Sequence, residues 1–354
     1  MKSERFDAIT SRYSNLRIAL VGDFCLDRYL EIDAARKEIS IETGLAVHNV
    51  VRVRSQPGAA GTILNNLVAL EIKTIYPIGF CGVDGEGFEL QRALGEKRGV
   101  QLDFFLQTPE RRTFTYCKPL VVEAARPPRE LNRLDSKNWS ATPRPVEEQL
   151  LSSVKKVADR VDALIVLDQV DIPETGVVTK TMLSFLGEIA RQNPGLLIIA
   201  DSRRGLRDYP AVAFKMNRME LAALTGKTVD LSLENVKGAA SELARRNQRP
   251  VFVTLSEQGI LGAAANGGVD HIAALPVRGE IDVVGAGDAV MANLTAALAA
   301  GAAIHEAIEL ANAAASIVIH QLGTTGTASR QQLRDLVGDE VRNWSAGSPA
   351  RQKS

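Results

Sequence analysis

The second half of the chain alternates segments of helical length with short apolar runs, and this alternation is the strongest constraint on its fold. Each predicted helix precedes a run rich in β-branched residues that is short enough to be a buried strand. The predicted helix and strand pairs are 146–160 with 163–167, 177–192 with 196–200, and 233–246 with 251–255. Such an alternation is typical of a mostly parallel sheet with helices on both faces, so the sequence predicts an α/β fold.

The first half of the chain starts with a strand of the same kind and then loses the regular alternation. The apolar run Arg17–Asp23, which ends in Gly-Asp, predicts a first buried strand. Between Tyr29 and Val53 the mixed alternation indicates exposed strands that stand off the main sheet, and the extended pattern resumes from Thr113. We therefore predict a small β lid beside the main sheet.

These segments suggest a single domain over residues 1–340, with lid segments at about 30–55 and 112–135. The Pro- and Arg-rich stretch 124–129 is expected to be a mobile loop, and the polar tail 341–354 is expected to be disordered.

Acids and amides recur where the predicted strands end. They are Asp23 and Asp27, Asp168, Asp201, Asn217 and Glu220, and Asp282 and Asp288. Ligands of open α/β sheets bind outside the carboxyl ends of the strands, so this shared placement predicts a binding edge. Any one of these acids taken alone is more often structural than functional.

The stretch Asp282–Asp288 carries the sharpest chemical signal. Its small residues Gly285, Ala286 and Gly287 precede a long apolar segment that predicts a buried helix from about Asp288. Such a turn can aim backbone N–H groups at an anion, and Asp288 beside it can take a proton from an attacking hydroxyl. The competing interpretation is a glycine-rich turn in which Asp288 only favours the helix start.

Composition excludes several classes of function. Lys and Arg together number 42, as do Asp and Glu, so no overall basic charge would recruit nucleic acid or an anionic membrane. Cys25, Cys81 and Cys117 are widely spaced and the four histidines form no metal-binding pair, which argues against a disulfide scaffold or a zinc site. No apolar run is long enough to span a membrane and Met1–Arg17 is too polar for a signal peptide, so we expect a cytoplasmic protein.

The motifs that are missing narrow the chemistry further. The sequence lacks the P-loop pattern, lacks Gly-x-Gly-x-x-Gly after the first strand, and lacks the Gly-x-Ser-x-Gly elbow of hydrolases. An anion-binding turn, an adjacent base and a candidate metal–water site remain. Those are the parts that phosphoryl transfer needs, because its catalysis is mainly positioning and charge neutralisation.

The sequence resembles the ribokinase-like (PfkB) sugar kinases over most of its length. The matching segments are Val21–Tyr29, Pro57–Gly61, Asn217 with Glu220, Thr254–Gly259, Asp282–Asp288, and Asn312–Ser316 with Leu322–Thr324. The first of these, and Ser256-Glu257-Gln258-Gly259, are most similar to the heptose-7-phosphate kinase domain of ADP-heptose synthesis enzymes. The resemblance implies a ribokinase-like fold. It also implies transfer of the ATP γ-phosphate to a hydroxyl of a sugar or sugar phosphate, with heptose 7-phosphate as one candidate.

The resemblance also implies roles for particular residues. Asp288 is expected to be the catalytic base, with Gly285, Ala286 and Gly287 as the anion hole. Asn217 and Glu220 would organise Mg²⁺ through water, with Asp282 as a further metal candidate. Thr254, Ser256, Gly259 and Asn312 would line the nucleotide pocket, and Asp27, Gly58, Ala59 and Thr62 the sugar pocket. ATP and Mg²⁺ are the implied cofactors, a monovalent cation is a further candidate, and a homodimer through the β lid is the implied assembly.

The sequence also departs from the family pattern, mainly on the sugar side. Ala59 and Thr62 stand where the family usually has a glycine and an asparagine, Glu71 replaces a usual glycine, and Val284 replaces a usual Thr or Ser. We expect a kinase domain alone, without the nucleotidyltransferase domain of the two-domain enzymes. The alternatives are a non-catalytic sugar- or nucleotide-binding regulator on the same fold and a nucleoside kinase of the same family.

Overall fold

The computed structural model describes the backbone of residues 1–123, 126, 128–226 and 232–343, and side chains within these ranges up to residue 337. Residues 124, 125 and 127 of the expected mobile loop lie outside the described residues, as does the expected disordered tail from residue 344. The tail prediction was wrong for residues 341–343, because they form the last turn of a helix that ends at Asn343.

A nine-stranded sheet forms the centre of the molecule, and its seven parallel strands confirm the prediction of a mostly parallel sheet. The spatial order is β14-β13-β12-β11-β10-β9-β1-β4-β5, and only the β12–β13 and β13–β14 pairs are antiparallel. In that order the strands are Val269–Ile272, Ile260–Ala263, Val251–Thr254, Ala213–Asn217, Leu197–Ser202, Ala163–Asp168, Arg17–Gly22, Thr74–Gly82 and Phe105–Thr108.

Helices cover both faces of this sheet, as the alternation predicted. Side chains of β1 alternate between the two cores: Ile18 and Leu20 pack into one, Ala19 and Val21 into the other. The helices of the first face are α1 (Ser3–Thr10), α2 (Ala60–Ala69), α3 (Gly85–Gly95), α8 (Ala286–Ala299), α9 (Ile304–Ile319) and α10 (Arg330–Asn343). Those of the second face are α4 (Arg144–Ala158), α5 (Lys180–Gln192), α6 (Arg218–Thr225) and α7 (Leu233–Asn247).

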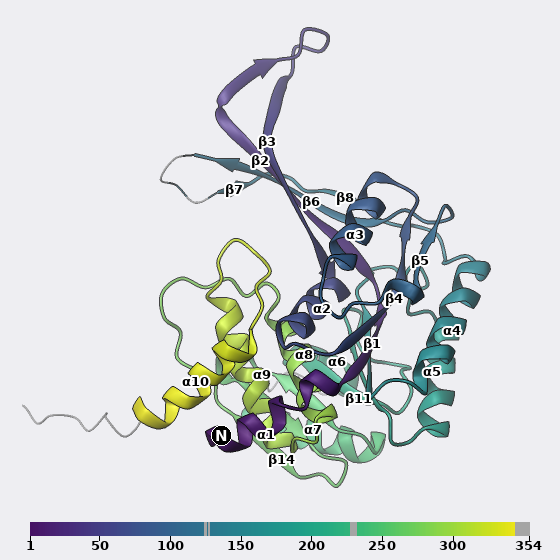
Figure 1. Cartoon of the computed structure of the whole chain (residues 1–354), viewed down its shortest axis with the longest axis vertical. Helices are drawn as coiled ribbons and strands as arrows, with labels where there is room; N and C mark the ends of the chain where they lie inside the picture. Colours follow the sequence, from purple (N-terminus) through teal and green to yellow (C-terminus); the bar gives the residue numbers. More distant parts are fainter. Residues whose placement is uncertain (124–125, 127, 227–231, 344–354) are drawn as a thin grey trace, which may run out of the picture.

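A second, smaller sheet forms the lid. It contains β2 (Phe24–Ile39), β3 (Ala46–Ala59), β6 (Phe114–Val122), β7 (Arg129–Glu130) and β8 (Leu134–Ser136). Figure 1 shows the long β2–β3 hairpin extending away from the main body. Because β2 follows the end of β1 almost directly and β3 runs straight into α2, the base of this hairpin lies at the carboxyl edge of the main sheet.

Helix boundaries differ from the prediction where capping residues decide them. Helix α5 starts at Lys180, three residues later than expected, because the Thr179 side chain accepts a hydrogen bond from the Met182 N–H and acts as the N-cap. Helix α8 starts at Ala286, two residues before Asp288, with Gly285 as its N-cap. Among the described residues, no helix combines the length and apolarity that crossing a bilayer requires.

Candidate active site

Two cavities meet at the first turn of α8, at the carboxyl edge of the main sheet. One, of about 180 Å³, is lined by Asp288 and Val284 together with residues of the lid. The other, of about 410 Å³, is lined by Ala286 and Gly287 together with residues of α9 and the loops after β12 and β14. Neighbouring residues of one helical turn therefore line both cavities, Asp288 the first and Ala286 and Gly287 the second.

The turn before α8 has a conformation that its sequence requires. Gly285 has φ 85°, and a Cβ at this position would lie 2.5 Å from the Thr325 Cγ2, so glycine is needed here. The Ala286 N–H donates to the Val283 carbonyl at 3.2 Å. Asp282 stabilises the same turn, because its Oδ1 accepts from the Val284 N–H at 3.0 Å and its own N–H donates to the Ile319 carbonyl.

Asp288 is the third residue of α8, and its half-buried carboxyl group lies in the lid-side cavity. Burial raises the pKa of this carboxyl to about 7; Lys215 opposes the increase, and the negative charges of Asp201 and Asp27 add to it. A carboxylate that titrates near neutral pH at the junction of two cavities suits general-base chemistry.

The lid-side cavity brings together most of the predicted sugar residues. Asp27 of β2, Ala59 and Thr62 all line it with Asp288. Position 58 requires glycine, because a Cβ there would lie 2.5 Å from the Asp27 Oδ2. Ala59 adopts φ 53° and ψ −118°, a region that favours glycine, at the start of α2.

Three cationic side chains also line this cavity: Lys118, Arg133 and Arg203. Although burial raises the pKa of Asp27, Lys118 and Arg133 act in the opposite direction, which shows that these charges face the carboxylate. Arg133 lies 4.8 Å from the centre of the Tyr116 ring. The sequence pattern did not identify these residues as a group.

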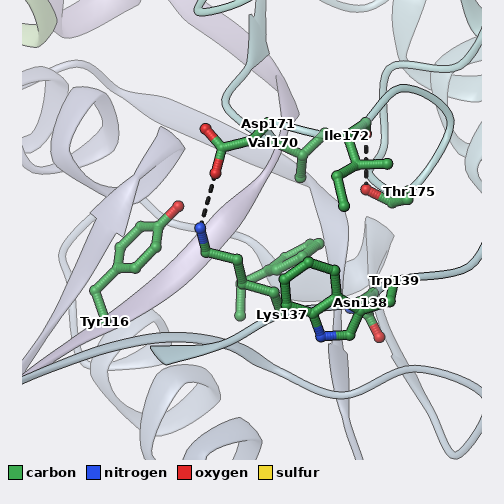
Figure 2. Close-up of a pocket in the computed structure, with 9 residues that line it drawn as sticks. Tyr116, Lys137, Asn138, Trp139, Val170, Asp171, Ile172 and Thr175 are labelled. Carbon is green, nitrogen blue, oxygen red and sulfur yellow. Dashed lines mark hydrogen bonds and ion pairs between the residues drawn. The ribbon is translucent and has the colours of Figure 1, made fainter. Parts of the chain in front are cut away.

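A small neighbouring cavity of about 50 Å³ lies beyond Tyr116, between the lid and the main domain (Figure 2). Asp171 forms ion pairs with Lys137 at 2.7 Å and with Arg203 at 3.1 Å. Lys137 follows lid strand β8 and Arg203 follows main-sheet strand β10, so Asp171 links the lid to the main domain. The same ion pair holds Arg203 beside the residues that are expected to bind the sugar.

The second cavity contains all four residues expected to bind nucleotide: Thr254, Ser256, Gly259 and Asn312. Gly259 has φ 90° and a Cβ would lie 2.0 Å from the Ile272 carbonyl, which excludes other residues. Much of the remaining lining is apolar, from Val277, Ile281, Val283, Val290 and Ile319. An apolar slot with a few polar groups is typical of a small-molecule site and fits a heteroaromatic base.

Asn217 and Glu220, the predicted metal residues, form a capping box at the start of α6. The Asn217 side chain accepts from the Glu220 N–H at 2.9 Å, and Glu220 Oε2 accepts from the Asn217 N–H at 2.7 Å. Burial raises the pKa of Glu220, and the negative charge of Asp201 adds to the increase. Nowhere in the described ranges do three or more His, Cys, Asp or Glu gather as a metal cage. Mg²⁺ often keeps its waters and uses one or two carboxylates, so a water-mediated site fits these residues.

The other acids at strand ends divide into structural and site residues. Asp23 accepts hydrogen bonds from the amides of Gln169, Val170 and Val177, and therefore anchors the loop after β9. Asp168 is fully buried and accepts from three side chains, those of Ser202, Arg204 and Tyr209. Asp201 instead pairs with Lys215, whose ammonium group lies under the α8 turn. The shared placement at strand ends therefore identified acids that lie at this edge of the sheet, but it did not separate the two kinds of acid.

Comparisons with known proteins identify the family of the chain. A family model described as pfkB family carbohydrate kinase matches residues 24–331. A bifunctional protein HldE from Rhodospirillum rubrum is 30% identical over 334 residues, covering 94% of this chain and 64% of the relative. One from Gluconacetobacter diazotrophicus is 28% identical, covering 92% and 64%. The chain thus spans less than two thirds of the length of these relatives.

Solved structures share the fold. Phosphofructokinase-2 from Escherichia coli, in complex with substrates and products, has a TM-score of 0.70 at 20% identity, covering 91% of this chain and 98% of that one. Ribokinase from Arabidopsis thaliana, in complex with ribose and ATP, has a TM-score of 0.64 at 17% identity, with the same two coverages. These similarities confirm the prediction of a ribokinase-like fold.

Proposed function

Because the chain belongs to the pfkB family of carbohydrate kinases, we propose that it is an ATP-dependent kinase that phosphorylates a hydroxyl group of a sugar phosphate. The observation that carries this proposal is the meeting of two cavities at the first turn of α8, with Asp288 on the acceptor side. ATP occupies the cavity lined by Thr254, Ser256, Gly259 and Asn312, and the acceptor occupies the cavity under the lid.

The reaction follows from the position of Asp288. The acceptor hydroxyl gives its proton to the Asp288 carboxylate, its oxygen bonds to the γ-phosphorus, and the bond from that phosphorus to the β–γ bridging oxygen breaks to release ADP. The backbone around Gly285 and Gly287, at the positive end of α8, stabilises the transferring group. The Ala286 amide already donates to Val283, so it contributes less than its two neighbours unless the turn rearranges. Asn217 and Glu220 would hold Mg²⁺ through water, and the bound ion would neutralise phosphate charge.

The cations under the lid favour an acceptor that already carries a phosphate. Lys118, Arg133 and Arg203 line the same cavity as Asp27 and Asp288. Arg133 also pairs with Asp135, and Arg203 with Asp171, so the cluster supplies cationic donors rather than an excess of positive charge. A neutral sugar needs no such cluster, whereas arginine and lysine are the usual phosphate ligands. Asp27 and Thr62 are left to hold sugar hydroxyls. Heptose 7-phosphate is the first candidate, because the segments Val21–Tyr29 and Ser256–Gly259 resemble the heptose-7-phosphate kinase domain of ADP-heptose synthesis enzymes.

The test is ADP formation from Mg-ATP with a panel of acceptors. The panel contains heptose 7-phosphate, hexose phosphates, the matching unphosphorylated sugars, and nucleosides. We expect turnover with a sugar phosphate and at least tenfold lower kcat/KM with its unphosphorylated partner. Preference for a nucleoside would support a nucleoside kinase. If no acceptor exceeds the Asp288→Asn background, the regulator alternative replaces the kinase.

We further propose that two copies pair through the lid. The β2–β3 hairpin exposes a row of large apolar side chains: Ile39, Ile41, Leu45, Val50, Val51 and Val53. Ile41 is 99% exposed, which is unfavourable unless another surface covers it. Light scattering should give a dimer for the native chain and a monomer for the Ile41→Glu/Val51→Glu double variant. A native monomer across the micromolar range would contradict this assembly.

Two further expectations concern the setting of the reaction. Cys25, Cys81 and Cys117 are free thiols, and the reaction consumes ATP, so we propose that the enzyme works in the cytoplasm, which cell fractionation would test. One structural neighbour, E. coli phosphofructokinase-2, was solved in complex with potassium. We therefore propose a monovalent-cation requirement, tested by comparing activity in potassium and in tetramethylammonium salts.

A further inference from the structure

The segment 273–283, here called the strap, forms one wall of the proposed nucleotide cavity. It connects β14 to the α8 turn and belongs to no helix or strand. Its side chains Val277, Ile281 and Val283 line the cavity, and they are 54%, 42% and 68% exposed. A ligand in this cavity would cover that apolar surface, so the position of the strap affects how tightly the ligand binds.

In the described part of the chain, three hydrogen bonds join the strap to α9, the helix on the other side of the cavity. At the start of the strap, the Asn312 Nδ2 donates to the Ala273 carbonyl at 2.8 Å. At its end, the Asp282 N–H donates to the Ile319 carbonyl at 2.8 Å. These two bonds fix the ends of the strap and leave its middle to the third.

The middle of the strap is held by the side chain of His320, the C-cap of α9. The Arg278 N–H donates to its Nε2 at 3.0 Å, and its Nδ1 lies 2.6 Å from the Ser316 carbonyl oxygen. Because a backbone N–H only donates and a carbonyl only accepts, Nε2 is the acceptor and Nδ1 carries the proton. One imidazole ring thus joins the strap, beside Val277, to the wall that contains Ser316.

The strap would lose its central restraint without this ring. Among the described residues, the bond to His320 is the one hydrogen bond between residues 274–281 and another part of the chain. Gly279, the residue after Arg278, has φ 80°, and glycine leaves the backbone free to take other conformations there. If the strap occupies its binding position in only a fraction of the molecules, the apparent Kd of the ligand rises in inverse proportion to that fraction.

We propose that His320 is a positioning residue that holds the strap against α9 and thereby sets the affinity of the chain for the nucleotide. The inference rests on the proposed kinase function and deepens it, because it assigns control of ATP binding to a residue outside the cavity lining. His320 takes no part in the transfer step. Its loss should therefore act on the KM for ATP and leave kcat unchanged.

The test uses two substitutions that each keep one half of the hydrogen bonding of the ring. His320→Gln places an acceptor near the position of Nε2, for the Arg278 N–H, and His320→Asn places a donor near the position of Nδ1, for the Ser316 carbonyl. Titration calorimetry with ADP and steady-state kinetics with ATP then measure the Kd and the KM.

We expect His320→Asn to raise both constants by about three- to tenfold, the usual effect of one lost hydrogen bond, while kcat stays unchanged. His320→Gln should keep both constants within about twofold of the native values, because it retains the bond to the strap. His305→Ala is the control, since His305 is an exposed residue at the other end of α9 and lines neither cavity. It should change neither constant.

Hydrogen exchange of the ligand-free chain tests the strap without any nucleotide. The amides of residues 274–281 should exchange faster in His320→Asn than in the native chain and in His320→Gln. Equal loss of ADP affinity in the two His320 variants would indicate a role in the packing of α9 and overturn the proposal. An unchanged Kd in His320→Asn would also overturn it and leave the kinase function in place. If the native chain binds ADP but turns over no acceptor, the kinase function fails, and the binding and exchange results still decide the role of His320.

Discussion

The two cavities that meet at α8 are built in different ways. The proposed nucleotide cavity is formed by residues between Thr254 and Ile319, from the end of the main sheet and the two long helices α8 and α9. The proposed acceptor cavity is assembled from segments that lie far apart in the chain, and the lid strands β2 and β6 contribute Asp27, Tyr116 and Lys118. The nucleotide cavity therefore belongs to the main domain alone, whereas the acceptor cavity depends on the position of the lid relative to the main domain.

This difference predicts that chemistry, ATP binding and acceptor binding respond to different substitutions. Changes at the α8 turn should act on kcat. Substitutions in the lid should change the KM for the acceptor and leave the KM for ATP unchanged. Changes in backbone strain at the base of the lid should mainly affect stability.

Removing the base should give the largest effect. Asp288→Asn should lower kcat by about 10²–10⁴-fold while the KM for ATP stays within about threefold, because a general base acts mainly in the transition state. Its melting temperature should not fall, since the substitution removes a charge that burial destabilises. Steady-state kinetics and thermal melts measure both quantities.

Asp282→Asn is the matched control at the other end of the same turn. The Asp282 Oδ1 accepts from the Val284 N–H, and asparagine keeps such an acceptor, so this substitution should leave stability nearly unchanged and affect kcat much less than Asp288→Asn. Equal losses of kcat in the two variants would contradict the assignment of the base.

The pH dependence should show the next largest effect. Burial raises the pKa of Asp288 to about 7, so below this pH the folded protein holds the proton and the base is lost. The value of kcat/KM should therefore rise with pH, with an acid limb near pH 7, and fall about tenfold for each unit below it. The groups that face Asp288 are Lys215 of β11, Asp201 of β10 and Asp27 of β2. A limb near pH 4 would indicate an ordinary exposed carboxyl and place the base elsewhere.

On the acceptor side, loss of one cation should change the KM for the sugar phosphate alone. Lys118→Met and Arg203→Met should each raise it by roughly tenfold or more, the usual effect of one charged hydrogen bond, without changing the KM for ATP. With the unphosphorylated acceptor, the two variants should match the native chain. Arg36→Met, at an exposed lid residue paired with Asp33, is the control and should change neither KM. A rise in the KM for ATP would show that the two cavities are not independent.

The same difference between the cavities explains what could be predicted from the sequence. The Asp282–Asp288 turn is a local pattern, and the nucleotide residues lie at the ends of strands and helices that the hydrophobic periodicity places. All four predicted nucleotide residues, together with Ala286 and Gly287, do line one cavity. Their contacts depend mostly on segments whose type and order the sequence already indicates.

The acceptor side could not be predicted to the same degree. Lys118 reaches the cavity because β6 pairs in parallel with β2, in a register that sets Tyr116 beside Asp27 and Lys118 two residues further along. Such a pairing joins segments about ninety residues apart, and no local pattern encodes its register. On the nucleotide side, His320 was missed for a related reason, because its ring bonds to the Arg278 N–H, 42 residues earlier in the chain. The sequence pattern did not predict the short helix α6, because Asn217 and Glu220, which cap it, resemble a metal motif.

The smallest expected effect tests the strain at the base of the lid. Ala59 adopts φ 53°, where its Cβ is unfavourable by about 1–2 kcal/mol and glycine is not. Ala59→Gly should therefore raise the free energy of unfolding by about 1 kcal/mol, after the entropy that glycine loses on folding is deducted. Ala60→Gly, one residue later and inside α2, should instead lower it by about 1 kcal/mol. Urea denaturation of the two variants measures both changes. Equal destabilisation by the two substitutions would mean that the backbone at Ala59 is relaxed. The replacement of the family's glycine by Ala59 would then affect the shape of the acceptor cavity, which Ala59 lines, rather than the stability of the turn.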